Sequence, residues 1–164
     1  GSCVRVEPAS LRPDLVTSEQ RAAYRQRFMA STQARLLVEP EIARLAARNA
    51  APEDIAALEA LLQRRNNPSG GERCFDEFHV ARAAGNPFLV EFVQQLVSEE
   101  QKGLSSFSLP MPESQKRAPD SLRDQHQKML DAIREGDEEF AYFYTKEHVK
   151  YVVRAYEEYF ALFC

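Results

Sequence analysis

The sequence predicts an all-α protein, an antiparallel bundle of six to seven helices. Glycine is scarce, at 6 of 164 residues, and long stretches consist mostly of Ala, Leu, Glu, Gln and Arg, which have high helix propensity. Apolar residues recur at helical spacing in these stretches, and none shows the alternation expected of a strand. Short connections rich in Gly, Pro and Asn favour antiparallel packing of successive helices.

The first helix follows a stretch that lacks periodicity. Residues 1–16 contain two prolines, so we expect a tail or linker there. Helical periodicity begins at Thr17, which is a suitable N-cap, and Gln20 stands where the partner in a capping box would. Pro40 is expected to interrupt or restart this helix, because proline lacks the backbone N–H that a helix interior uses. Residues 17–164 are long enough for one domain with one core.

Proline and glycine delimit the later helices. Pro52 opens the second helix, with acidic residues in its first turn. Gly85 and Gly136 are expected to end helices, and residues 103–119, with three prolines, are expected to form a loop. The remaining helices are expected from about Glu72 to Ala84, over residues 88–97, from Asp120 or Ser121 to about Glu135, and from near Asp137 almost to Cys164.

Composition excludes several classes of protein. The net charge is -4 and no basic stretch is present, so this chain is not expected to hold DNA by itself. No apolar run approaches the roughly 20 residues that a membrane span needs, and no signal peptide is visible. Cys3, Cys74 and Cys164 have no paired spacing, which is typical of free thiols in a reducing compartment. We therefore expect a cytoplasmic protein with no membrane partner.

The three histidines are the main candidates for chemistry. His79, His126 and His148 each fall in a different predicted helix. Imidazole binds zinc, nickel, copper and iron, and helix bundles bring such ligands together from facing helices. Asp76 is three residues before His79 and shares its helix face. Single histidines on helices are more often surface or hydrogen-bonded residues than ligands, so both interpretations stay open at the level of the residues.

Four segments follow one another in the order found in a known family. They are ARLLVEPEIARLAARNAAPEDIAAL (Ala34 to Leu58), DEFH with the later AAGNP (Asp76 to Pro87), the pattern HxxxLxAIxxGD (His126 to Asp137), and His148, 22 residues after His126. In these segments the chain resembles the FCD domain, the C-terminal effector domain of FadR-branch GntR transcription regulators. The resemblance covers most of residues 20–150.

The resemblance implies a metal site. In the metal-binding members one Asp and three His hold a divalent cation, and the matching positions are Asp76, His79, His126 and His148. Asp76 stands one residue later than the usual aspartate, at the position after Phe75. Zinc is the expected metal, with nickel, manganese or iron as alternatives.

The resemblance also implies a small carboxylate effector. The family has an arginine near the cavity at the position of Arg35, whose guanidinium would clamp a carboxylate; an ion pair with Glu39, one turn away, is the alternative. Tyr144 could donate its hydroxyl to the effector, with core packing as the alternative. The aromatic residues from Tyr151 to Phe163 are expected to be core or dimer contacts.

The implied function is ligand sensing and not catalysis. An organic acid would bind at the metal, favour one arrangement of a homodimer, and so change DNA binding by winged-helix domains that this chain lacks. Residues 1–16 would be the remnant of the junction to such a domain. Two alternatives stay open: a metal-free helical module that binds an apolar or acyl ligand, and a metal-dependent bundle enzyme. The sequence offers the D-x-x-H spacing of Asp76 and His79 once, whereas di-iron bundles need paired motifs.

Overall fold

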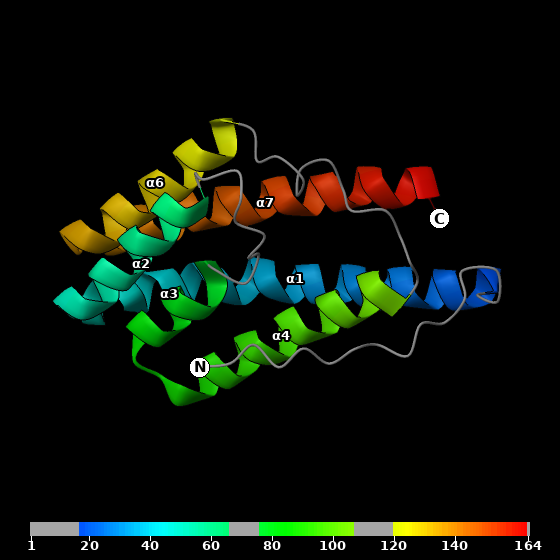
Figure 1. Cartoon of the computed structure of the whole chain (residues 1–164), viewed down its shortest axis with the longest axis horizontal. Coiled ribbons are helices and arrows are strands. Elements are labelled where there is room, and N and C mark those ends of the chain that lie inside the picture. Colours follow the sequence, from blue (N-terminus) through cyan, green and yellow to red (C-terminus); the bar gives the residue numbers. More distant parts are fainter. Residues whose placement is uncertain (1–16, 66–75, 107–119, 164) are drawn as a thin grey trace.

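The computed structural model describes residues 17–65, 76–106 and 120–163. These ranges contain six helices and no strand (Figure 1), so the predicted all-α bundle is confirmed. The helices are α1 (Ser18–Asn49), α2 (Pro52–Arg65), α3 (Asp76–Ala84), α4 (Pro87–Ser106), α6 (Asp120–Glu135) and α7 (Glu138–Phe163). The expected tail over residues 1–16 and the three cysteines lie outside the described ranges.

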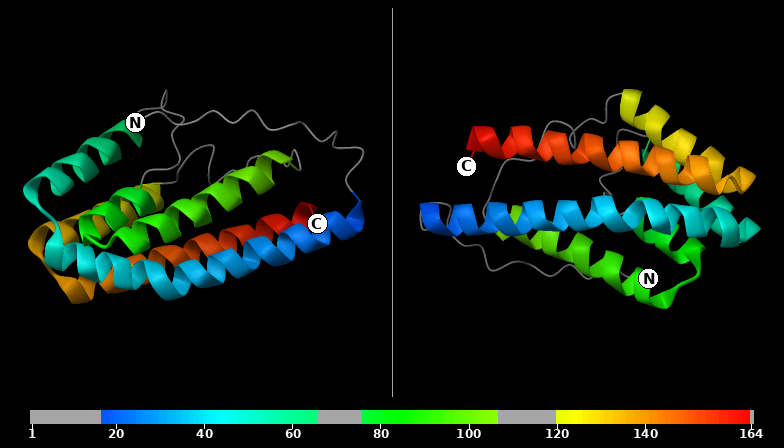
Figure 2. Two further views of the ribbon diagram at one scale, coloured as in Figure 1. Left: turned by 90° about the horizontal axis from the view of Figure 1, so that it is seen from below. Right: turned by 180° about the vertical axis from the view of Figure 1, so that it is seen from behind.

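The two longest helices, α1 and α7, lie side by side and antiparallel along the bundle (Figures 1 and 2). At one end Arg48 Nη2 lies 2.6 Å from Glu138 Oε1. Towards the other end the rings of Phe28 and Tyr156 have centroids 4.6 Å apart. The helices α2, α3 and α6 gather around the half of this pair in which α1 ends and α7 begins. The α1–α7 pair is therefore the frame on which the other helices are placed.

Apolar side chains form two separate cores, so the expectation of one core is wrong. The larger core lies in the half that contains α2, α3 and α6, and includes Ile42, Leu58, Val93 and Ile133. The smaller, aromatic core lies towards the opposite ends of α1 and α7. It consists of Phe28, Tyr156, Tyr159 and Phe160, with Tyr24, Met29 and Val152 packed against it. The expectation that C-terminal aromatic residues are core contacts is confirmed for Tyr156, Tyr159 and Phe160.

A layer of buried polar side chains lies between the two cores. It contains every buried polar or charged side chain among the described residues, and we call it the polar layer. On α1 it falls between Phe28 of the aromatic core and Ile42 of the larger core, and on α7 between Ala141 and Tyr156. Its members are Thr32, Arg35, Glu39, His126, Thr145 and His148.

Local signals for helix ends are confirmed. Thr17 Oγ1 accepts a hydrogen bond from Gln20 N at 3.1 Å, and Gln20 Oε1 accepts one from Thr17 N at 2.9 Å, which completes the capping box. Pro52 is the first residue of α2. Gly85 and Gly136 follow α3 and α6 with φ of 77° and 70°, in the left-handed region that glycine adopts without steric cost.

Two expectations about helix bounds are wrong. Pro40 does not interrupt the first helix, because α1 continues through it to Asn49. Its ring is almost fully buried, so packing compensates for the missing hydrogen bond. The expected loop over residues 103–119 begins too early, because α4 continues to Ser106. A single glycine such as Gly103 costs a helix only about 1 kcal/mol, which is too little to end it.

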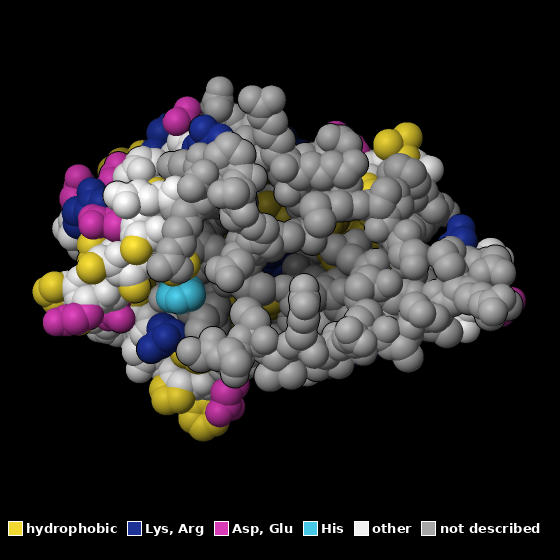
Figure 3. Space-filling model, viewed as in Figure 1, with side chains coloured by type: hydrophobic (Ala, Val, Ile, Leu, Met, Phe, Trp, Pro, Cys, Tyr) yellow, Lys and Arg dark blue, Asp and Glu magenta, His cyan; other side chains and the backbone are white. Residues whose placement is uncertain are grey.

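Charged side chains of both signs lie at one end of the molecule. On the face drawn in Figure 3, acidic and basic side chains are intermixed at the end occupied by α2 and α6. Such mixing is typical of a solvated surface. None of the described helices is both long enough and apolar enough to cross a bilayer.

The aromatic core allows a first prediction. Phe160 is fully buried against the rings of Tyr24, Phe28, Tyr156 and Tyr159, so Phe160→Ala should lower the free energy of unfolding by about 3–5 kcal/mol. Urea unfolding followed by circular dichroism measures the change. Leu162→Ala is the control, because Leu162 on the same helix is 79% exposed and should change stability by about 0.5 kcal/mol or less. Equal effects of the two substitutions would show that the aromatic core is misassigned.

Candidate functional site

Two of the three histidines meet inside the polar layer. His126 on α6 and His148 on α7 are 4% and 6% exposed, and their Nε2 atoms lie 3.3 Å apart. Their ring centroids are 4.5 Å apart, with an angle of 61° between the planes. The tight turn at Gly136 makes α6 and α7 antiparallel neighbours, and this brings residues 22 positions apart to the same level.

Gln125 orients one of these rings. His148 Nδ1 lies 3.0 Å from Gln125 Oε1, and an amide oxygen can only accept a hydrogen bond. With Gln125 Oε1 as the acceptor, Nδ1 is the donor, and in a neutral imidazole the Nε2 that faces His126 then carries the lone pair. A ring nitrogen held by an oxygen acceptor while the other is bare is the usual state of a metal-binding histidine.

The separation of the two Nε2 atoms suits a shared cation as well as a hydrogen bond. Zinc–nitrogen distances are about 2.0–2.1 Å, so two nitrogens of a tetrahedral zinc site lie about 3.3–3.4 Å apart. The observed separation is 3.3 Å. The donor set also fits, because imidazole is a favoured ligand of zinc, nickel and iron. His126 and His148 thus have the spacing and chemistry of two metal ligands.

The other two predicted ligands are on α3, and the structure does not group His79, the one of the two whose side chain is described, with this pair. His79 is partly buried on α3, which packs on α1 beside α2 and α4. Among the described residues there is no group of three or more His, Cys, Asp or Glu side chains placed to hold a metal. Asp76 is the first residue of α3, and its side chain is outside the described part.

Arg35 makes the ion pair that was the alternative to effector binding. Arg35 Nε donates to Glu39 Oε1 at 2.7 Å, one helical turn away on α1. Both residues are buried, at 5% and 7% exposure. Since the two charges balance, the pair places a guanidinium in the polar layer without adding net charge there.

Tyr144 packs as a partly buried aromatic residue. Its ring stacks on that of Phe140 with centroids 5.5 Å apart and meets Phe143 edge to face at 5.6 Å. Lys128 Nζ lies 5.9 Å from the ring centroid. The side chain also packs against the larger core. Tyr144 therefore makes the packing contacts that were the alternative to effector binding.

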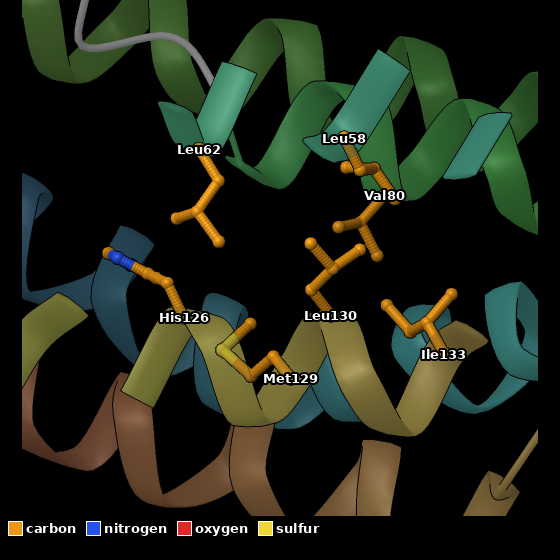
Figure 4. A pocket seen from close by; sticks show the side chains of 7 residues that line it. All are labelled: Leu58, Leu62, Val80, His126, Met129, Leu130 and Ile133. Carbon is orange, nitrogen blue, oxygen red and sulfur yellow. The ribbon is translucent and has the colours of Figure 1, made fainter. Parts of the chain in front are cut away.

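A small apolar pocket adjoins His126. Leu58, Leu62 and Val80 face Met129, Leu130 and Ile133 across it, and His126 lies at one edge with its ring directed away from the middle (Figure 4). The volume of this cavity is about 20 Å³, which is room for about one water. All lining side chains other than His126 are apolar.

Sequence reasoning missed two polar residues at the site. Gln125 immediately precedes His126, but neither composition nor periodicity indicates that it binds His148. Thr145 is buried on α7, three residues before His148 and therefore on the same helix face. Only this shared face could have indicated Thr145, and only after His148 had been assigned to the interior.

Comparison with known proteins identifies the family. A sequence model of the FCD domain matches residues 30–151, which is most of the chain. The chain belongs to the FCD domain family. FCD domains are effector-binding, regulatory domains of GntR-type regulators and not enzymes. No curated protein matches the chain. The matched FCD segment runs from α1 into α7 and contains the whole polar layer.

The buried ion pair gives a second prediction. Glu39→Ala should lower the free energy of unfolding by about 3 kcal/mol, because it leaves the buried guanidinium of Arg35 without its carboxylate. Glu41→Ala is the matched control on the same helix, since the Glu41–Arg44 pair is largely exposed and should contribute less than about 1 kcal/mol. Guanidinium unfolding measures both. Similar losses in the two variants would mean that the Arg35–Glu39 pair is solvated.

Proposed function

We propose that this FCD domain is the ligand-sensing domain of a FadR-branch GntR regulator and binds a small organic acid at a metal site. The observation that supports this most strongly is the pairing of His126 and His148, buried, 3.3 Å apart, with Nδ1 of His148 held by Gln125. His79 and Asp76 of α3 are proposed as the remaining ligands, and His79 would have to move towards the pair when the cation binds, because the structure does not group it with them. Zinc is the first candidate, with nickel, manganese or iron as alternatives.

The proposed role of the cation is to attract an anion. When bound it would supply positive charge in a region of low dielectric constant, where a carboxylate would otherwise be costly to bury. Arg35 is the proposed second anchor, because a guanidinium can donate two parallel hydrogen bonds to a carboxylate while it keeps Glu39 as a partner. Tyr144 is proposed to contribute its hydroxyl at the edge of this site.

We further propose that the domain acts in a cytoplasmic homodimer. The acid would favour one of two dimer arrangements and thereby change the DNA affinity of attached winged-helix domains. Phe140 and Phe143, each about half exposed on α7, offer apolar surface to a second copy.

The apolar pocket supports a second candidate function, a metal-free domain that binds an apolar or acyl ligand. Six apolar side chains line that pocket, and its room is limited to about one small group unless side chains move. Under this hypothesis the histidines form only a buried hydrogen bond. A chelator would then leave the melting temperature unchanged, and a metal added to the protein would not raise it.

Metal retention is the third prediction. His126→Ala and His148→Ala should each abolish metal retention, because each removes one imidazole of the buried pair, while circular dichroism shows that the fold stays largely helical. Elemental analysis should find about one metal ion per chain in the parent and none in the two variants. Asp76→Ala should have a smaller effect, because its spacing to His79 departs from the family pattern.

Two outcomes would refute the metal proposal. One is a parent without metal whose melting temperature is unaffected by zinc or by a chelator. The other is equal metal content in the parent, His126→Ala and His148→Ala. Tyr142→Phe is the control, since its ring lies beside Arg44 and Lys146 and outside the polar layer, and it should retain the parent's metal.

The fourth prediction concerns assembly. Light scattering should give about twice the 18.7 kDa mass of the chain. Phe143→Ser should shift the mass towards that of one chain, because it removes apolar contact surface that is about half exposed in the single chain. A parent that scatters as one chain over the micromolar range contradicts the dimer.

A further inference from the structure

Thr145 has a buried hydroxyl that none of the described residues satisfies. The residue is 3% exposed, and its Oγ1 has no hydrogen-bond partner within the described part of the chain. A buried polar atom without a partner costs free energy, so such an atom needs an explanation.

Other hydroxyls in the bundle show the usual alternative. Thr32 Oγ1 donates to the carbonyl oxygen of Met29 at 2.8 Å, and Ser31 Oγ donates to that of Phe28 at 2.6 Å. A helical threonine can therefore satisfy its hydroxyl within its own helix, as is common for Ser and Thr. Thr145 makes no such bond, although it is also in the middle of a helix.

The position of Thr145 links it to the histidine pair. It precedes His148 by three residues on α7, so the two side chains are neighbours on one helix face. The pairing of His126 with His148 between antiparallel helices places Thr145 at the level of Met129, one turn further along α6.

The opposite helix brings charge to the same level. On α7, Thr145 is seven residues after Glu138 and eleven before Tyr156. Glu138 pairs with Arg48 of α1, and Tyr156 contacts Phe28 of α1. These contacts place Thr145 level with residues 39–41 of α1, where the carboxylate partner of Arg35 lies. Thr145 is thus level with Glu39 of α1 and about one helical turn from His148 on α7 and His126 on α6.

We propose that Thr145 determines effector specificity by donating its hydroxyl hydrogen to an oxygen of a bound carboxylate. This inference rests on the proposed function. A threonine hydroxyl has one hydrogen to donate, whereas a carboxylate only accepts, so the two are complementary. A carboxylate bound to Thr145 would lie about one helical turn from the His126–His148 pair, so the same ligand could reach both. Hydrogen bonds to charged acceptors are short and strong, which suits a residue that selects among ligands.

The test compares Thr145→Val, which keeps the shape and removes the hydroxyl, with Thr145→Ser, which keeps the hydroxyl. The probes are acetate and succinate, titrated by NMR into zinc-loaded protein. Thr145→Val should bind the probe about tenfold to a hundredfold more weakly than the parent, and Thr145→Ser within about threefold of it. The affinity for zinc alone should be the same in all three proteins.

The melting temperature without a probe distinguishes ligand binding from a structural role of the hydroxyl, because the two predict opposite changes in Thr145→Val. Thr145→Val should melt at or above the temperature of the parent, because it removes an unpartnered polar atom. The control Thr32→Val should melt lower, because it removes a hydrogen bond that the fold makes. If Thr145→Val loses as much stability as Thr32→Val, the hydroxyl has a structural role and the proposal is overturned.

The binding results separate this inference from the proposed function. Equal affinities of the parent and Thr145→Val for acetate and succinate would overturn the role of Thr145. They would not contradict the metal site. A parent that binds zinc but neither probe refutes the carboxylate effector, and the role of Thr145 with it. A parent that binds no zinc refutes the metal site itself.

Discussion

The antiparallel packing of α1 against α7 is the constraint on which the rest of the structure depends. It sets which residue of one helix meets which residue of the other, from the Arg48–Glu138 ion pair at one end to the Phe28–Tyr156 contact towards the other. Because the two helices span both cores, the polar side chains between those cores are buried along the pair. The interior of this FCD domain is therefore divided into apolar, polar and aromatic zones along one axis.

The presence of the polar layer is not explained by its contribution to stability alone. A buried ion pair such as Arg35–Glu39 is often no more stable than well-packed apolar residues of the same volume, because desolvation offsets the attraction. The two buried imidazoles likewise bring polar nitrogens into the interior, where aliphatic side chains would need no hydrogen-bond partner. Retaining several such groups at one level is typical of a binding site within a bundle, which agrees with the effector-binding role of the family.

Local chemistry was predictable from the sequence, whereas contacts between helices were not. The capping box at Thr17 and the glycine at position 136 act within a few residues, so their sequence patterns determine the outcome. Pro40 was assigned wrongly because its burial against other helices outweighs its local cost. The family pattern selected His126 and His148 as residues of interest, but their spacing of 22 residues carries no geometric information until the two helices are placed.

Pro40 also has a mechanical consequence. Since proline has no N–H, the carbonyl of Leu36 receives no helical hydrogen bond from that position, and the ladder of α1 has a gap there. Bending α1 at this gap breaks fewer bonds than bending it elsewhere. The gap lies beside Glu39, at the level of the polar layer. A rearrangement of those side chains can therefore change the curvature of the longest helix. Such a change would alter the relative orientation of the larger core and the aromatic core, which the helix connects.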